Sequence, residues 1–383
     1  MDSKIEEPAK QPEEKVLTGN AGEWSEVYVF FSILGDRAIF PCDAALNREQ
    51  EAAIPVIEIR RGKGKQGNLA YRFSNSPNAR WEIYEGGECK GVVTPEEGRN
   101  EAVSLLEELQ SAIKNKGGSA LTFPKALKFL RMLHSSSLKA KALEKKDIEL
   151  TIDDVRAGGK VACGFSIKSY ISGAPTLLNP SARTLFEYKV TGLDDEAIEE
   201  INLNRIGLIV SSIEGKGGRI AFAGMNSQYR KNLMFIDTSM PELVSGLLLE
   251  HFRSCGCTPS TERRKVKDTT KVFAEKDQMG WNNSALYDYK MKKFMEATAL
   301  GMLPSKPWEG IEEANGGFIV VKPKGEIVTF HIYNRNVFMD YLFNHTKFET
   351  PSTSRYECGK LVKTESGECV LRLPLQIRFC TDS

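Results

Sequence analysis

The sequence DIELTIDDVRAGGKVACGFSIKS occupies residues 147–169 and contains two segments with the two-residue period of a β-strand. Polar and apolar residues alternate in the first segment, which ends at Asp154, and the second segment covers Val161–Ser169. The intervening residues 156–159, RAGG, are typical of a turn. The stretch therefore predicts a β-hairpin with acidic residues at the end of its first strand.

Ser166 and Lys168 lie two residues apart on the second strand, so their side chains share one face of it. The alternate positions are apolar and are expected to face the core. A lysine on such a strand needs a partner or a function, because a buried ammonium is costly. One interpretation is a structural Asp–Lys pair across the hairpin. The other is a phosphodiester-cleaving site, in which carboxylates hold Mg²⁺ and a lysine stabilises the phosphate.

An aspartate followed by an acid-x-Lys triplet on the next strand resembles the PD-(D/E)xK nuclease superfamily. In that pattern Asp154 is the first acid and Lys168 the lysine. The sequence departs from the pattern at two places. Ile152 or Asp153 stands where the proline is expected, and Ser166 stands where the second acid is expected. Which of Asp153 and Asp154 faces the metal is left open.

The missing carboxylate is expected from a helix, as in related nucleases with the same departure. The segment that opens at Gly19 has Glu23 and Glu26 three residues apart, on one face of an expected helix. We expect Glu26, or else Glu23, to bind the metal. The alternative is that both are first-turn glutamates that favour the helix dipole.

Working outward, the apolar periodicity predicts further elements. Helices are expected at 23–35, 95–114, 239–253, 284–300 and 335–344. Strands are expected at 54–60, 80–84, 147–155, 161–170, 219–223, 232–237, 317–321, 327–333 and 371–379. The order lacks a strict βαβ rhythm, so we expect an α/β or α+β fold with a mixed central sheet flanked by helices.

The chain is long enough for more than one domain. Residues 1–17 are charged and lack aromatic residues, and they are expected to be a disordered leader. Residues 18–240 are expected to form the nuclease core with the catalytic hairpin. Residues 241–383 are expected to form an additional C-terminal α+β region that completes a DNA-binding cleft.

The overall charge excludes a histone-like binder, because 52 Lys and Arg balance 51 Asp and Glu for a net charge of +1. A neutral enzyme can still bind DNA in one basic cleft. No apolar run approaches the ~20 residues of a membrane span, and no signal peptide is evident. We therefore expect a cytoplasmic protein with reduced thiols and no membrane association.

Several ordered blocks of sequence resemble the HpaII family of type II restriction endonucleases. The resemblance runs from about Thr18 to Phe379, nearly the whole chain, and the blocks that carry it are 19–26, 164–169, 175–179, 286–294, 314–317, 331–336 and 346–355. The resemblance implies a bacterial enzyme that cuts double-stranded DNA at a short palindrome, with Mg²⁺ as cofactor. The palindrome expected from the family is CCGG, and the expected products carry 5′-phosphate and 3′-hydroxyl ends. A cognate DNA methyltransferase is the implied functional partner, and a palindromic target suits a homodimer.

Guanine is best read by a bidentate arginine in the major groove. Arg355 is the first candidate, and Ser354 beside it can bind a backbone phosphate. Asn334 and Arg335 are the second candidates. The alternative interpretations are a helix cap for Asn334 and a surface arginine for Arg355.

Two other functions are compatible with parts of the pattern. A catalytically inactive, sequence-specific DNA-binding protein explains the basic loops but not the Asp, Lys and Glu set. A nuclease that acts on RNA or branched DNA is the second, although the aromatic stacking motif of common single-strand binders is missing.

Overall fold

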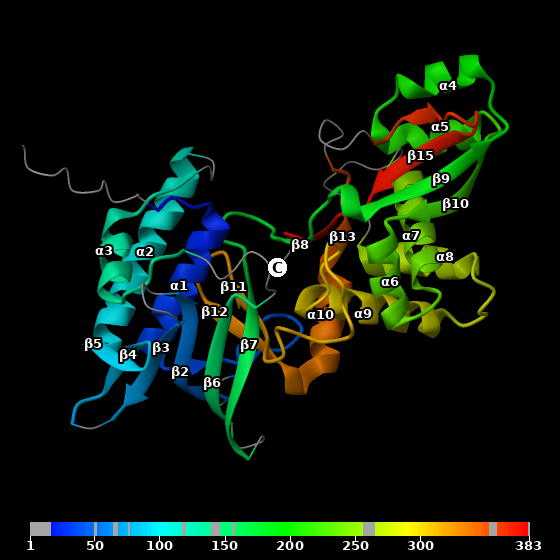
Figure 1. Ribbon diagram of the computed structural model, residues 1–383. Helices are drawn as coiled ribbons and strands as arrows, with labels where there is room; N and C mark the ends of the chain where they lie inside the picture. The colour runs from blue at the N-terminus through cyan, green and yellow to red at the C-terminus, as the bar shows by residue number, and fades with distance from the viewer. Residues whose placement is uncertain are drawn as a thin grey trace, which may run out of the picture.

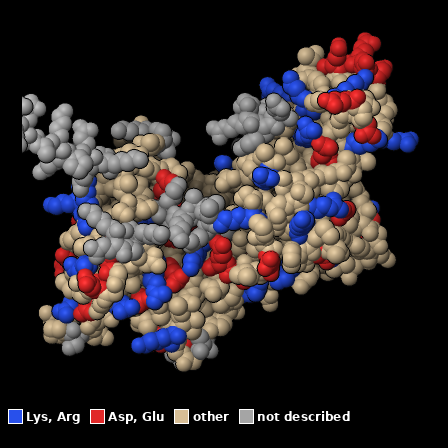
Figure 2. Space-filling view, viewed as in Figure 1, with Lys and Arg blue, Asp and Glu red and all other residues tan. Residues whose placement is uncertain are grey.

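The computed structural model describes residues 17–49, 52–63, 68–75, 77–116, 120–138, 146–154, 158–255, 265–351 and 358–381. They form two lobes (Figure 1), and the space-filling view is hollowed between them at its upper edge (Figure 2). The first lobe contains the predicted hairpin, and the second contains most of the C-terminal half. Strands β8 and β13 lie where the lobes meet (Figure 1).

A nine-stranded mixed sheet forms the first lobe, in the order β12-β11-β7-β6-β2-β3-β4-β5, with β1 paired to β2. Only the β7–β11 pairing is parallel. The strands are β1 (Ala38–Ile39), β2 (Ile54–Lys63), β3 (Asn68–Ser74), β4 (Arg80–Glu85), β5 (Glu88–Val93), β6 (Ile148–Asp154), β7 (Gly159–Ser169), β11 (Gly317–Val321) and β12 (Ile327–His331).

Helices α1 (Ala21–Asp36), α2 (Pro95–Lys116) and α3 (Pro124–Met132) pack against this sheet. Helix α1 is almost entirely buried, and its Trp24 donates a hydrogen bond from Nε1 to the Leu121 carbonyl at 3.0 Å. The helix begins with a capping box in which Asn20 and Glu23 accept each other's backbone N–H groups. This cap fixes the first turn, so Glu26 occupies a defined position one turn further along.

The second lobe has a four-stranded sheet, β10-β9-β15-β14, and a three-stranded sheet, β13-β16-β8. Its strands are β8 (Thr176–Leu178), β9 (Leu185–Thr191), β10 (Arg219–Met225), β13 (Thr346–Phe348), β14 (Leu361–Lys363), β15 (Cys369–Pro374) and β16 (Ile377–Phe379). Its helices are α4 (Asp195–Asn202), α5 (Ile209–Gly215), α6 (Ser227–Ile236), α7 (Met240–Cys255), α8 (Val266–Glu275), α9 (Ser284–Leu300) and α10 (Arg335–His345). A second core cluster fills this lobe and reaches one face of β11 and β12.

The predicted fold class, a mixed sheet flanked by helices, is confirmed. The sheets cross the division expected at residue 240, because β11 and β12 complete the first sheet while β9 pairs with β15. The glycines of the 314–317 block allow this crossing. Gly317 has a φ of 127°, and a side chain there would clash with the Phe330 carbonyl on β12.

The strand predicted at 232–237 is wrong, because these residues complete α6 and the turn after it. Asn226 caps the helix by accepting the Tyr229 N–H at 3.2 Å. Asn232 is buried and donates to the carbonyls of Leu303 and Lys306 at 3.0 and 2.7 Å. These tertiary hydrogen bonds fix a helical side chain within an apolar run that favours a strand.

In the part of the chain that the structure describes, we find no helix with the length and apolar character needed to cross a membrane.

Candidate active site

The β6–β7 hairpin forms as predicted, and its register determines which acid lies near Lys168. Asp154 pairs with Gly159 and Ile148 pairs with Phe165. Asp147, directly before β6, therefore lies across from Ser166. Its Oδ2 accepts the Ile167 N–H at 2.6 Å and lies 3.3 Å from the donating Ser166 Oγ. These two donors orient the Asp147 carboxylate at the end of β7 that carries Lys168.

Ser166 is buried, with 3% of its surface exposed. A serine is a poor metal ligand, but here its hydroxyl supports a carboxylate from the neighbouring strand. The position expected to hold the second acid is thus coupled to Asp147 by a hydrogen bond.

Lys168 is half-buried near the end of β7 and forms no ion pair with any residue that the structure describes. Its ammonium lies close enough to Glu26 to lower the pKa of that carboxyl. The structural alternative, an Asp–Lys bridge across the hairpin, would need an ion pair with an aspartate on β6. No such pair is present among the described residues.

Glu26 lies on α1 and faces the same group of charges. Burial, followed by the nearby Asp147 carboxylate, raises the pKa of Glu26 to about 8, against the opposing effect of Arg61 and Lys168. Its Oε2 is buried and has no hydrogen-bond partner among the described residues. A buried carboxylate oxygen without a partner is costly, unless a group that is not part of the chain satisfies it.

Glu23 lies one turn before Glu26 and raises its pKa slightly further. The Glu23 carboxylate accepts the Asn20 N–H at 2.9 Å and so completes the capping box. Helix stabilisation therefore accounts for Glu23, while Glu26 has no such structural partner. Of the two glutamates, Glu26 is the better candidate ligand.

Asp154 lies at the other end of the hairpin from Lys168, contrary to the expected site. Its partner Gly159 is nine positions from Lys168 along β7, which corresponds to roughly 30 Å at about 3.3 Å per residue. Asp154 is buried and its Oδ2 lies 4.0 Å from His331 Nε2 at the end of β12. Its neighbour Asp153 is exposed. The register therefore separates both aspartates from Lys168 and Glu26.

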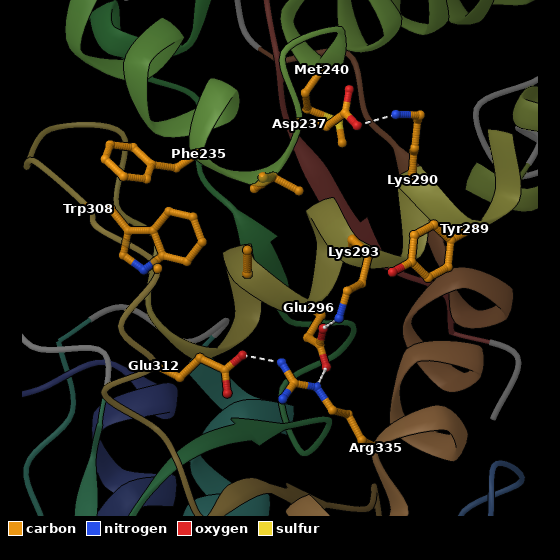
Figure 3. Close-up of a pocket in the computed structure, with 13 residues that line it drawn as sticks. Phe235, Asp237, Met240, Tyr289, Lys290, Lys293, Glu296, Trp308, Glu312 and Arg335 are labelled. Carbon is orange, nitrogen blue, oxygen red and sulfur yellow. Dashed lines mark hydrogen bonds and ion pairs between the residues drawn. The ribbon is translucent and has the colours of Figure 1, made fainter. Parts of the chain in front are cut away.

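Arg335 and Asn334 lie at the beginning of α10. Arg335 pairs with Glu296 and Glu312 and borders a cavity of about 250 Å³ (Figure 3). Glu296 is 2% exposed and also accepts Lys293 Nζ at 2.8 Å. Asn334 is at the N-cap position of α10 without a side-chain cap hydrogen bond. Base reading by Arg335 stays a prediction, and it requires release of two carboxylates.

Ser354 and Arg355 lie outside the described residues, so their predicted contacts with DNA stay predictions. The N-terminal end of α1 and the end of β7 that leads to β8 lie toward the hollow between the lobes (Figure 1). The space-filling view shows this hollow with Lys and Arg side chains beside it (Figure 2).

The carboxylates of Glu26 and Asp147 suit Mg²⁺ better than a metal ion whose ligands all come from the protein. The described residues contain no group of three or more His, Cys, Asp and Glu placed to hold a metal ion. Mg²⁺ is commonly bound by one or two carboxylates, with water and substrate phosphates as the remaining ligands. Asp147 and the unpartnered oxygen of Glu26 fit that arrangement. The spacing in the sequence points to Asp154 rather than to Asp147, because Asp147 stands at the beginning of the expected strand.

Comparison with known proteins gives the family of the chain. The family model described as HpaII restriction endonuclease matches residues 20–379. The chain is 34% identical over 368 residues to the type II restriction enzyme HpaII of Haemophilus parainfluenzae, covering 95% of this chain and 99% of that enzyme. No solved structure was found to match.

Proposed function

The chain belongs to the HpaII family of restriction endonucleases, and we propose that Glu26, Asp147 and Lys168 form its Mg²⁺-dependent cleavage site. The family makes it a site-specific deoxyribonuclease that acts on double-stranded DNA. One observation supports the proposed site. Glu26 on α1, Asp147 at the start of β6 and Lys168 on β7 lie close together. We further propose CCGG as the target and a homodimer as the active form.

In this proposal each residue has a distinct task. Glu26 and Asp147 supply carboxylate oxygens to Mg²⁺, and Ser166 keeps Asp147 in place. Bound Mg²⁺ would neutralise charge on the scissile phosphate and make its bound water a better nucleophile. Lys168 orients that water and stabilises the negative charge that develops on the phosphate oxygens. Attack in line with the leaving 3′ oxygen leaves 5′-phosphate and 3′-hydroxyl ends.

Sequence recognition is assigned to other residues. Arg355 is the proposed guanine reader, with Ser354 on a backbone phosphate. A cytoplasmic bacterial enzyme of this kind requires that host DNA be protected, and a cognate methyltransferase is the proposed partner. The test of the whole proposal is cleavage with sequencing of the product ends.

We expect purified protein to cut unmethylated plasmid DNA into discrete fragments with Mg²⁺ and to leave it intact with EDTA. Sequencing of the fragment ends is expected to show one palindrome, CCGG. Plasmid that stays intact at every enzyme concentration would exclude the proposed activity and favour a binding protein. Fragments at another palindrome would retain the activity and reject the target.

Glu26→Gln is expected to stabilise the metal-free protein at high pH. The raised pKa means that the folded state loses stability as pH rises from 4.5, the ordinary pKa, to about 8. Glutamine removes that loss, so its melting temperature should exceed that of the parent at about pH 9 by a few degrees, at about 2–4 °C per kcal/mol. The difference should shrink at about pH 5, where Glu26 is protonated in the folded protein.

Thermal melting at both pH values checks this prediction, with and without MgCl₂. Magnesium should raise the melting temperature of the parent more than that of the variant, because only the parent keeps both carboxylates. A stability difference that does not change with pH would contradict the assignment of Glu26 as the strained carboxylate.

A further inference from the structure

A buried arginine lies beside the candidate metal site and has no role in the cleavage chemistry proposed above. Arg61 on β2 is 3% exposed, whereas the side chain of the preceding residue, Arg60, is 52% exposed and pairs with Glu58 and Glu149. Arginine is rarely buried to this extent without a carboxylate in contact. The position of Arg61 therefore needs an explanation.

Backbone carbonyls, rather than a carboxylate, contact the Arg61 guanidinium. Nη1 lies 3.5 Å from the Ser137 carbonyl, and Nη2 donates to the Leu138 carbonyl. The Phe30 ring centroid lies 5.5 Å from its central carbon. Nε has no hydrogen-bond partner among the described residues, and none of their carboxylates pairs with Arg61. No direct ion pair with a described carboxylate therefore neutralises the Arg61 guanidinium, and its charge acts on charged groups slightly further away.

Those groups are the proposed metal ligands. Arg61 lowers the pKa of Glu26, while Glu26 and Asp147 oppose the lowering of the Arg61 pKa by burial. Arginine stays protonated even when buried. Two cations, Arg61 and Lys168, therefore face the carboxylates in a region with little solvent to screen them. In the metal-free site these two positive charges offset the negative charges of the two carboxylates.

Arg61 also connects the strand to the helix that carries Glu26. The Leu138 side chain packs against Gly19, where an added Cβ would lie 2.8 Å from Leu138 Cδ1. Gly19 lies just before the cap of α1. By holding the Leu138 carbonyl, the guanidinium links β2 to the N-terminal end of α1 and so to the position of Glu26.

We propose that Arg61 is a positioning residue that keeps Mg²⁺ affinity low until DNA is bound. Without DNA, the buried cation repels Mg²⁺ and offsets the charge of Glu26 and Asp147. The scissile phosphate adds the negative charge that the metal then needs. This coupling makes metal loading depend on substrate, and it rests on the proposed function, because it assumes that the two carboxylates bind Mg²⁺.

The test is the binding of MgCl₂ to DNA-free protein, measured by isothermal titration calorimetry. Arg61→Gln removes the charge and retains a donor for one of the two carbonyls. We expect it to bind Mg²⁺ about tenfold more tightly than the parent, because a unit charge at this range in a partly buried site acts strongly on a divalent ion. Loss of structure alone would weaken the binding instead.

Two control variants separate charge from geometry. Arg60→Gln removes the same charge from an exposed position on the same strand, and its Mg²⁺ affinity should change by less than about twofold because solvent screens it. Arg61→Lys keeps the charge but loses the planar fork. Its Mg²⁺ affinity without DNA should match the parent within about twofold, while its cleavage rate falls because the hold on Ser137 and Leu138 is lost.

Equal or weaker Mg²⁺ binding by Arg61→Gln overturns the proposal, and so does undetectable binding by both proteins. Where melting shows that Arg61→Gln does not fold, Arg61→Lys decides: unchanged affinity supports the role of charge, and tighter binding overturns it. The proposed function fails separately, through intact plasmid with the parent protein or through Mg²⁺ binding that Glu26→Gln leaves unchanged.

Discussion

Lys168→Ala is expected to abolish DNA cleavage while the protein stays folded and bound to DNA. The half-buried ammonium forms no ion pair among the described residues, so its removal leaves no partner behind. Loss of a group that acts on both the water and the phosphate typically costs ~10²–10⁴-fold in rate. Cleavage of a single-site DNA at saturating Mg²⁺ measures that loss, and thermal melting measures the fold.

Lys160→Ala is the matched control for this prediction. Lys160 lies on the same strand, eight residues before Lys168, and it is exposed near the start of that strand. Lys160→Ala removes the same side chain and the same charge, but at a position away from the proposed site. The cleavage rate should therefore stay within about twofold of the parent. If Lys168→Ala cut DNA as fast as Lys160→Ala, the site would lie elsewhere in the molecule.

Much of the fold could be predicted because local patterns and tertiary structure agree. Helix α9 begins and ends where its periodicity places it, at Ser284 and Leu300. Strand β11 does the same at Gly317 and Val321. The expected helix at 95–114 extends by two residues to Lys116. In each case one buried face or one continuous apolar run gives a strong signal.

The errors arise where distant residues decide the local structure. The apolar run that contains Asn232 favours a strand, whereas the Asn226 cap and hydrogen bonds to carbonyls about 70 residues away stabilise a helix there. The return of β11 and β12 to the first sheet is likewise a long-range pairing. Periodicity within a segment carries no information about which sheet that segment joins, so the division expected at residue 240 does not follow the strand order.

The candidate site was only partly predictable from the sequence, because the pattern does not select Asp147. The three-residue spacing along the expected helix selects Glu26 as a candidate, and the structure places Glu26 close to Lys168. A turn centred on residues 156–159 would place Ser166 across from Glu149, so the predicted turn does not give the hairpin register that the structure has. Paired residue numbers across the hairpin, such as 154 and 159, sum to 313, so Ser166 faces residue 147. The observed register selects Asp147, whereas counting the usual spacing back from Lys168 selects Asp154.

Asp147→Asn and Asp154→Asn are therefore expected to behave in opposite ways. Asparagine at 147 can still accept the Ile167 N–H and the Ser166 hydroxyl, so the hairpin end should keep its structure. It removes one negative charge from the proposed metal site, and cleavage should fall by roughly 10²–10³-fold, the usual range for loss of one strong electrostatic group. Raised Mg²⁺ should recover part of the rate.

Asp154→Asn tests the same chemistry at the far end of the hairpin. Its carboxylate lies 4.0 Å from the buried His331 ring, so the substitution should lower the melting temperature, as is typical when a buried polar contact is altered. The cleavage rate of the folded variant should stay within about threefold, because roughly 30 Å of strand separates residue 154 from Lys168. Single-turnover cleavage of the two variants, with equal Mg²⁺ and enzyme in excess, gives the comparison directly. A loss of cleavage at 154 with full cleavage at 147 would restore the acid expected from the family pattern, and the register of β6 and β7 in the active enzyme would then have to differ from the one described here.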